Sequence, residues 1–277
     1  MGKSEMIKRA AKFILKGVPV INNTVYVKVL SCDRKDAFAY RHVLITGGSS
    51  GIGYAIAEKI LKGGGKVCVT GRDRLKLETA QKRLGEGCKT LVFDIADIGK
   101  IQHMLYQAIE QLGGKLDTVV SNAGIFYEKS FCDYTSEDWE RICNINLAGG
   151  YFLAQEAIRY FLNNEIQGNI LFTSSERGIM SDTHIYGIAK AGVNSLIKGL
   201  ARQCAGKGIR INGVAPGMTA SGINSIDSDS NLYHPSVAGK RVIRPEEIAE
   251  VAAFLISNAS ACINGEIIAC DNANYIR

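Results

Sequence analysis

The stretch Thr46-Gly47-Gly48-Ser49-Ser50-Gly51-Ile52-Gly53 connects a short apolar run, residues 41–46, to an amphipathic run, residues 52–61. The first run is rich in β-formers and the second repeats apolar residues at helical spacing, so we predict a strand followed by a helix. Glycine at this turn lets backbone N–H groups approach a pyrophosphate at the positive end of the helix. A tight turn alone would also need glycine, but the position between strand and helix favours a dinucleotide-binding site.

Short apolar runs and helical runs alternate from this stretch to the end of the chain. We predict seven strands, at residues 41–46, 66–70, 90–94, 116–121, 169–173, 209–214 and 266–270, and helices that include 52–61, 98–112, 139–162, 185–205 and 245–256. The strands do not strictly alternate in polarity, which is typical of strands covered on both faces. The pattern predicts an α/β fold: a Rossmann-like, doubly wound parallel sheet flanked by helices, in a single domain over residues 41–277.

Residues 1–40 form an extension that does not belong to this alternation of strands and helices. Residues 6–15 place apolar side chains on one face of a predicted amphipathic helix among lysines, and a strand-like run follows at residues 24–30. The helix, within residues 1–20, could lie on an anionic membrane surface, but we favour packing on the body or on a neighbouring subunit. The short apolar stretch, interrupted by lysine, argues against a cleaved secretory signal.

The composition excludes several classes of protein. The chain of 277 residues is 46% hydrophobic and 22% charged, which is typical of a soluble globular protein. Four units of its net charge of +6 come from residues 1–20, so the body has no bias towards nucleic acid. The eight cysteines and four histidines are dispersed. This spacing predicts reduced thiols in a cytoplasmic protein and supports no metal site.

The segment HIYGIAK, residues 184–190, begins the predicted helix 185–205 and places Tyr186 and Lys190 four residues apart. Positions i and i+4 lie on one face of a helix, so the phenol and the ammonium can approach each other. By itself the pair could be an ordinary surface contact, because short motifs also occur by chance.

Seven features, in order and spacing, resemble the short-chain dehydrogenase/reductase family. They are TGxxxGxG from Thr46 to Gly53, Asp94 after the third strand, SNAG (Ser121-Asn122-Ala123-Gly124), NINLAG (residues 144–149), YGIAK (residues 186–190), APG (Ala215-Pro216-Gly217) and RPEEIAEVAAFL (residues 244–255). The resemblance covers about residues 41–273. It implies an oxidoreductase that moves a hydride between C4 of a nicotinamide and a carbonyl or carbinol carbon.

The resemblance also implies which residues act. Tyr186 is the general acid and base, Ser175 holds the substrate oxygen, Asn146 supports a water relay to Lys190, and Lys190 binds the nicotinamide ribose. We choose Ser175 over Ser174 because the family's serine stands three residues before a glycine, here Gly178; Asn144 is the less favoured register for Asn146. Tyrosine has an ordinary pKa of about 10, so we expect the Lys190 ammonium, and the positive nicotinamide of the oxidised cofactor, to lower it towards neutrality.

Cofactor choice depends on the end of the second strand, where Gly71 is followed by Arg72 and Asp73. A carboxylate there would bond the adenosine ribose of NAD, whereas an arginine can hold the 2′-phosphate of NADP. We expect Asp73 to cap the next helix, and so predict NADP(H) in preference to NAD(H), with Arg72 as the discriminator and Arg74 as a helper. The predicted cofactor-binding residues are Thr46, Gly47, Ser49, Ser50, Gly51, Ile52, Gly53, Arg72, Asp94, Ile95, Asn122, Ala123, Gly124, Tyr186, Lys190, Pro216, Gly217 and Thr219.

The substrate is less well defined by the sequence. Residues 218–242, the lid segment of the family, are rich in Ser, Asp and Asn, which suits a small or polar carbonyl compound. Relatives that reduce 3-oxoacyl groups on acyl carrier protein carry basic residues before the fifth strand. This chain has Asn163-Asn164-Glu165-Ile166-Gln167 there, although Arg202 matches a second docking position. We therefore place that activity second to a general carbonyl reductase.

Three further expectations complete the prediction. A cofactor-binding sensor or scaffold without turnover is the alternative from another class, but such proteins typically lose the tyrosine or the lysine. The resemblance also implies a homodimer or homotetramer built on the helices 139–162 and 185–205. Finally, Asp271-Asn272-Ala273 stands where the family usually has Asp-Gly-Gly, so we expect a different turn at the C-terminal end.

Overall fold

A parallel sheet of seven strands forms the centre of the computed structural model, which describes residues 23–28, 35–222, 224 and 226–275. The strand order is β3-β2-β1-β4-β5-β6-β7, and every neighbouring pair is parallel. The strands are β1 (His42–Thr46), β2 (Lys66–Gly71), β3 (Cys88–Val92), β4 (Thr118–Ser121), β5 (Asn169–Thr173), β6 (Arg210–Pro216) and β7 (Ile267–Cys270). The predicted doubly wound α/β fold is confirmed.

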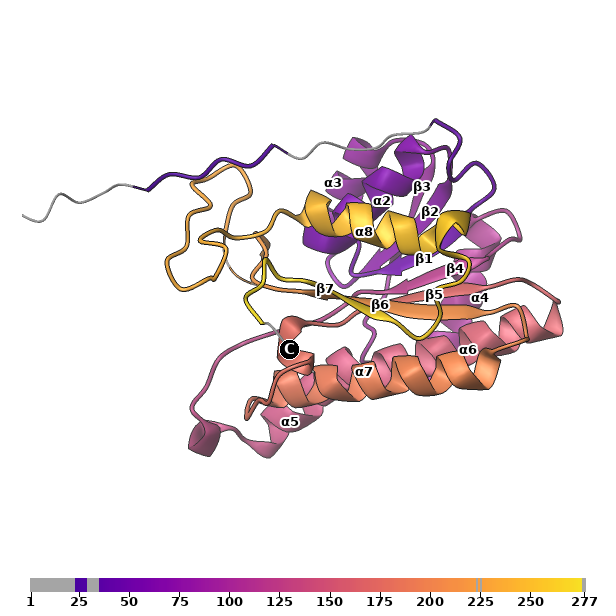
Figure 1. Ribbon diagram of the computed structural model, residues 1–277. Coiled ribbons are helices and arrows are strands. Elements are labelled where there is room, and N and C mark those ends of the chain that lie inside the picture. Colours follow the sequence, from indigo (N-terminus) through magenta and orange to yellow (C-terminus); the bar gives the residue numbers. More distant parts are fainter. Residues whose placement is uncertain (1–22, 29–34, 223, 225, 276–277) are drawn as a thin grey trace, which may run out of the picture.

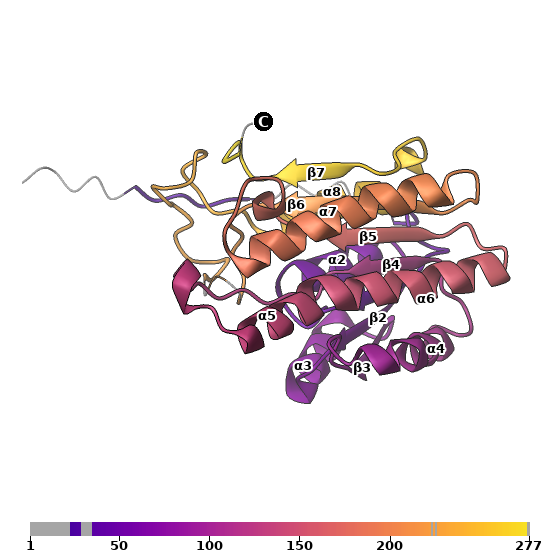
Figure 2. The same ribbon diagram turned by 90° about the horizontal axis from the view of Figure 1, so that it is seen from below.

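Helices cover both faces of this sheet (Figure 1). One face carries α2 (Gly51–Lys62), α3 (Arg74–Leu84) and α8 (Pro245–Ile256), whereas the other carries α4 (Ile101–Gln111), α6 (Gly149–Asn163) and α7 (Ile185–Cys204). Figure 2, seen from below, shows α6 and α7 side by side, with α5 (Ser136–Cys143) leading into α6. Each face therefore has its own apolar layer.

The pleat of the strands divides the core between those layers. In β1, Val43 and Ile45 join the cluster beneath α2 and α8, whereas Leu44 points into the cluster beneath α4, α6 and α7. All three side chains are fully buried. Each such side chain contributes about 2 kcal/mol through removal from water. Burial on both faces explains why these runs are apolar throughout rather than alternating.

The chain reverses its direction of travel across the sheet at β1. The chain moves outward from β1 to β2 and β3, then returns to the other side of β1 to form β4. The loops that leave the carboxyl ends of β1 and β4 therefore separate and leave a crevice between them, which is where ligands bind in sheets of this type. The glycine loop, Asn122 and Ser174 all follow strands that end at this edge.

Several predicted boundaries differ from the structure. The single helix predicted at residues 139–162 begins earlier, at Ser136, and is divided into α5, a π-helix (Asn144–Ala148) and α6. Its start is set by Thr135, which forms a capping box with Asp138. Strand β3 lies two residues earlier than predicted, and the helix predicted from residue 98 begins with a 3-10 turn (Ile98–Lys100) before α4.

Part of the N-terminal extension lies against the lid segment. Residues 23–28 form no strand, contrary to the strand-like run predicted there. Instead, Val25 O accepts a hydrogen bond of 3.0 Å from Leu232 N, and Val25 N donates to Asn231 Oδ1 at 2.8 Å. Val27 packs on a small apolar cluster inside the lid segment. The predicted helix at residues 6–15 lies outside the described residues.

The body of the fold includes residues just before β1. Phe38 is buried and donates its backbone N–H to Gly63 O at the end of α2. A side chain at Gly63 would collide with the Phe38 ring, since an added Cβ would come within 2.5 Å of it. Among the described residues, no helix is long and apolar enough to cross a membrane.

Candidate active site

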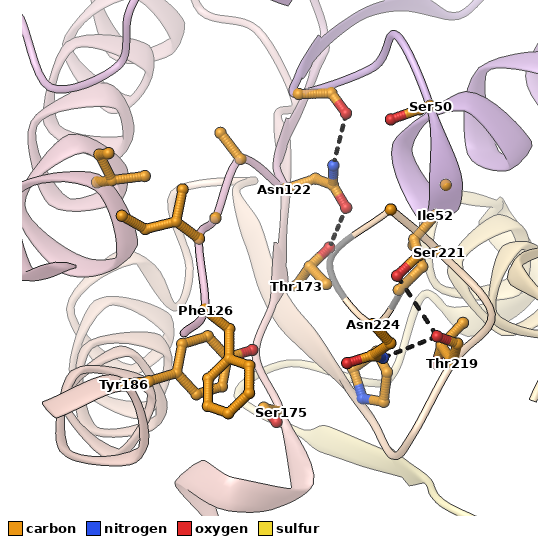
Figure 3. A pocket seen from close by; sticks show the side chains of 18 of the residues that line it. Ser50, Ile52, Asn122, Phe126, Thr173, Ser175, Tyr186, Thr219, Ser221 and Asn224 are labelled. Carbon is orange, nitrogen blue, oxygen red and sulfur yellow. Dashed lines mark hydrogen bonds between the residues drawn. The ribbon is translucent and has the colours of Figure 1, made fainter. Parts of the chain in front are cut away.

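A cavity of about 470 Å³ opens at the carboxyl edge of the sheet, between the glycine loop and the start of α7. Figure 3 shows Tyr186, Phe126 and Ser175 on one side of it, and Ser50 and Ile52 on the other. The predicted site residues that line it are Gly47, Ser49, Ser50, Gly51, Ile52, Arg72, Asp94, Ile95, Asn122, Ala123, Gly124, Ser175, Tyr186, Lys190, Pro216, Gly217 and Thr219. Thr46, Gly53 and Asn146 are not among the lining residues.

Thr46 joins the two loops that flank the crevice. Its Oγ1 accepts hydrogen bonds from the backbone N–H groups of Asn122, at 3.0 Å, and Ala123, at 3.1 Å. The Asn122 amide in turn donates to Thr46 O and Gly47 O, each at 3.0 Å. Gly47 has a φ of +66°, and a Cβ there would lie 2.9 Å from Ala123 Cα. Only glycine fits this close approach, which brings the loops together.

The glycine loop fits the phosphates of a dinucleotide. Helix α2 begins at Gly51, directly beside the cavity, and its N-cap Ser50 makes no side-chain capping bond. The first turn of α2 contains no acidic residue. The helix therefore presents backbone N–H groups and its positive end to the cavity without a competing carboxylate.

The far end of the cavity contains the residues predicted to choose the cofactor. The Arg72 side chain is 52% exposed, and its Nη1 lies 3.8 Å from Asp94 Oδ2. The Asp73 side chain accepts from Lys76 N at 3.1 Å, so Asp73 caps α3 as expected. Arg74 does not line the cavity, whereas Lys76 does. Lys76, which was not predicted, therefore joins Arg72 in the cavity lining.

Tyr186 and Lys190 lie on the first turns of α7, with the lysine beneath the tyrosine. Lys190 is 4% exposed, its Nζ donates to Thr173 O at 2.7 Å, and it lies 5.6 Å from the centroid of the Tyr186 ring. Burial lowers the pKa of Lys190 from its ordinary value to about 8. The predicted approach of ammonium and phenol on one helix face is present.

The pKa of Tyr186 shifts in the opposite direction from the one predicted. The ring is partly open to the cavity, yet burial is the largest influence and raises its pKa above the ordinary value. The groups that lower its pKa are the Ser175 hydroxyl, through a hydrogen bond, and the Arg177 guanidinium, through its charge. Lys190, which we expected to lower this pKa, is not among the groups that do so, and desolvation outweighs the charges nearby.

Two neighbouring serines at the end of β5 have different surroundings. The Ser174 hydroxyl donates to Asn194 Oδ1 at 2.5 Å, and Asn194 donates to Gly178 O at 2.9 Å. The Ser174 hydroxyl therefore helps to hold the turn after β5 against α7. Both serines line the cavity, but it is the Ser175 hydroxyl that forms a hydrogen bond with the Tyr186 phenol. Of the two hydroxyls, only that of Ser175 contacts the phenol of Tyr186 among the described residues.

Asn146 lies in the π-helix, behind the cavity wall. Its Nδ2 donates to Ile125 O and to Ile142 O, both at 3.0 Å, and its Oδ1 accepts from Ile125 N at 3.2 Å. A Cβ added to Gly124 would lie 2.8 Å from Asn146 Oδ1 and 3.8 Å from Lys190 Nζ, so both groups lie beside that glycine. Asn144 is exposed instead. The π-helix supplies the extra residue that turns Asn146 inward.

Several cavity residues were not predicted. Phe126 packs edge-to-face on Tyr186, with ring centroids 5.2 Å apart, and Arg177 lies over Phe126 at 5.4 Å. Arg177 Nε and Nη2 donate to the two oxygens of Asp182 at 2.6 and 3.0 Å. Asp182 fits because the residue opposite it is Gly187, where any Cβ would collide with its carboxylate. The charged pair directly after Ser175 was the only sequence signal for Arg177.

The C-terminal turn contacts both the cavity and the lid segment. Asn272 and Ala273 have φ angles of 53° and 59°, so non-glycine residues hold the left-handed conformation that glycine favours. Asp271 stabilises the turn by accepting from Ala273 N and Tyr275 N, each at 3.1 Å. Beyond it, Asn274 donates to Glu176 Oε2 at 3.0 Å and accepts from Ala238 N at 3.2 Å.

Known proteins are similar to this chain over most of its length. A family model described as enoyl-(acyl carrier protein) reductase matches residues 47–272. Glucose 1-dehydrogenase from Gluconobacter oxydans is 33% identical over 247 residues, which cover 86% of this chain and 92% of that protein. A 3-oxoacyl-(acyl-carrier-protein) reductase from Mycobacterium bovis is 33% identical over 245 residues, which cover 86% of this chain and 94% of that protein.

A solved structure is similar over the same region. The 3-ketoacyl-(acyl-carrier-protein) reductase from Brucella melitensis, complexed with NADH, has a TM-score of 0.79 at 26% identity. The likeness covers 86% of this chain and 99% of that one. Every residue that lines the cavity falls within the stretch matched by the family model.

Proposed function

We propose that this chain, which belongs to the short-chain dehydrogenase/reductase family, interconverts a carbonyl and a secondary alcohol with NADP(H) and uses Tyr186 as general acid and base. The chain is an oxidoreductase that acts on CH–OH or C=O groups. The observation that supports the proposed roles best is the position of Ser175, Tyr186 and Lys190 in one cavity that extends to the glycine loop. A cofactor and a small substrate can meet there.

Different residues of the cavity would bind the cofactor, hold the substrate and transfer the proton. The glycine loop and Arg72 would hold the cofactor, which supplies or accepts the hydride when bound. The Ser175 hydroxyl would hold the substrate oxygen, and the Tyr186 hydroxyl would donate its proton to that oxygen during reduction. A raised pKa keeps Tyr186 protonated at neutral pH, as a donor must be. Ser175 and Arg177 then stabilise the phenolate that remains, because both favour the charged form.

The substrate is a small or polar carbonyl compound in this proposal, with 3-oxoacyl groups on acyl carrier protein as the second candidate. Relatives bearing both kinds of name are about equally similar to the chain. The test is a screen of ketones and alcohols that follows NADPH or NADP by absorbance. Steady turnover of any of them excludes a sensor or scaffold without catalysis, whereas a complete lack of turnover by folded protein contradicts the proposed activity.

NADP(H) is the proposed cofactor because Arg72 lines the cavity while the neighbouring carboxylate, Asp73, is occupied as a helix cap. We expect Arg72→Ala to weaken NADPH binding by about tenfold to a hundredfold relative to NADH, through loss of a charge-assisted contact. Fluorescence titration with both cofactors measures this. The matched control is Arg74→Ala, which removes an equal charge two residues away and outside the cavity lining. If the unmodified protein binds NADH as tightly as NADPH, the assignment is wrong.

We propose a homodimer or homotetramer that assembles through the outer surface of α5, α6 and α7. Large side chains are exposed there, namely Trp139, Tyr151 and Ile188, at 49%, 45% and 43%. Light scattering at micromolar concentration is expected to give at least twice the mass of one chain. Tyr151→Glu should lower that mass, whereas Leu75→Glu, at an exposed apolar residue of α3, should not. A monomer would contradict the proposal.

A further inference from the structure

Glu176 places a carboxylate in the wall of the cavity, directly after Ser175. It begins a short 3-10 helix (Glu176–Gly178) and is only partly exposed. Its Oε2 accepts from Asn274 Nδ2 at 3.0 Å and would lie 3.0 Å from a Cβ added to Gly217. Among the described residues, no other hydrogen bond reaches this carboxylate. One of its oxygens is therefore fixed, and the other is left for a ligand.

The charge of Glu176 is only partly offset, by the neighbouring Arg177, whose charge lowers the pKa of Glu176. No Lys, Arg or His within the described ranges forms an ion pair with it, and the nearby carboxylate of Asp271 adds a second negative charge. Arg177 is adjacent, but its guanidinium already pairs with both oxygens of Asp182 and stacks on Phe126. Burial raises the pKa of Glu176, because a charged carboxylate is less stable when it is partly removed from water.

We infer that Glu176 recognises a hydrogen-bond donor on the substrate, so the preferred substrates are carbonyl compounds or alcohols that carry a further hydroxyl or protonated amine. This inference rests on the proposed function, since it places the substrate at Ser175 and Tyr186. Glu176 lines the same cavity as Ser175 and Tyr186, so a group held by Glu176 can belong to the same small molecule as the reacting carbon. Anionic substrates are disfavoured, because they would approach a carboxylate that is held by no ion pair among the described residues.

Asn274 is a positioning residue for this contact. Its amide nitrogen holds Glu176 Oε2, while its oxygen accepts from Ala238 N in the lid segment. The carboxylate is therefore fixed against the segment that would cover a bound substrate. A fixed acceptor loses less conformational freedom when a ligand binds than a mobile one does.

The test uses four cyclohexanones of similar size: the unsubstituted ketone and its 4-hydroxy, 4-amino and 4-carboxy derivatives, with the amine protonated at pH 7. With NADPH, the unmodified enzyme should have a kcat/KM for the hydroxy and amino compounds about tenfold or more above that for cyclohexanone. The gain should come mainly from KM. Glu176→Leu should remove both preferences. Glu176→Gln should remove the preference for the amine and keep part of that for the hydroxyl, because its amide oxygen still accepts a hydrogen bond.

Glu128→Gln is the matched control. Glu128 also lines the cavity, but its side chain is 74% exposed, so its removal tests a general effect of negative charge. The preference ratios should survive this change. Thermal melting of each variant shows whether it is folded, and Glu176→Gln preserves the shape of the side chain should Glu176→Leu not fold.

Three results would overturn the inference: equal kcat/KM values for all four ketones, a preference for the carboxylate, which would assign recognition to Arg177, or unchanged ratios in Glu176→Leu. Calorimetric binding of the same compounds with NADPH present separates the two proposals. If no ketone is reduced, the proposed function fails. The inference about Glu176 then stands if the hydroxy and amino compounds bind more tightly than cyclohexanone and Glu176→Leu abolishes the difference, and it falls otherwise.

Discussion

Tyr186→Phe is expected to lower kcat by about 10²- to 10⁴-fold, because it removes the only group that we propose for proton transfer to the substrate oxygen. The ring remains, so its packing against Phe126 and the shape of the cavity are kept. The affinity for NADPH should therefore change little. Steady-state kinetics and a cofactor titration measure the two quantities separately.

Tyr134→Phe is the control for this variant. It also removes one phenolic hydroxyl near α7, where Tyr134 donates to Tyr127 O at 3.3 Å and packs near His184, but Tyr134 does not line the cavity. Its kcat should stay within a few-fold of the unmodified enzyme. Near-normal turnover by Tyr186→Phe would remove tyrosine from the mechanism altogether.

Lys190→Met is expected to abolish most activity and to weaken cofactor binding, yet to make the folded chain more stable at neutral pH. The side chain is 4% exposed, and burial lowers its pKa from 10.5 to about 8. A shift of that size corresponds to a penalty of about 3 kcal/mol for the buried ammonium. Loss of the hydrogen bond to Thr173 O offsets part of the gain.

The pH dependence distinguishes this explanation from a general packing effect. Between pH 8 and 10.5 the unfolded chain holds the lysine proton that the folded chain has released. The free energy of unfolding of the unmodified protein therefore rises with pH in that window. The penalty is complete below pH 8 and absent above 10.5, so the advantage of Lys190→Met should shrink across the window. Denaturant unfolding at pH 7 and pH 10 measures it, and an advantage independent of pH would contradict the assignment.

The sequence was sufficient to predict the seven strands because both faces of the sheet are covered, which makes each strand an apolar run. The third strand was placed two residues too late for a physical reason. Strand β3 lies at the sheet edge, and its register is set by pairing with β2, where Cys88 lies opposite Val67. The more apolar residues that follow, Leu91 to Phe93, drew the prediction two positions too far along the chain. Hydrogen-bonding partners, and not polarity, define an edge strand.

The sequence was more informative about the positions of the site residues than about their pKa values and ion pairs. Motif spacing located the glycine loop, Tyr186 and Lys190, because these depend on local turns and helix periodicity. The direction of the Tyr186 pKa depends on burial, which only the folded chain reveals. Glu176 was not predicted as a site residue because its position depends on a hydrogen bond from Asn274, which is 98 residues away. Its charge depends on its neighbour Arg177, which pairs with Asp182.

The lid segment is held from both sides by partners that are distant along the chain. Val25 and Asn231 are separated by 206 residues, and Ala238 and Asn274 by 36. Contacts of such separation form late, because the intervening chain must already be ordered, and segments with few buried contacts open first in the native state. We therefore expect the lid segment to open more readily than the β1–β5 core. In native-state hydrogen exchange, its backbone amides should exchange faster than those of the central strands.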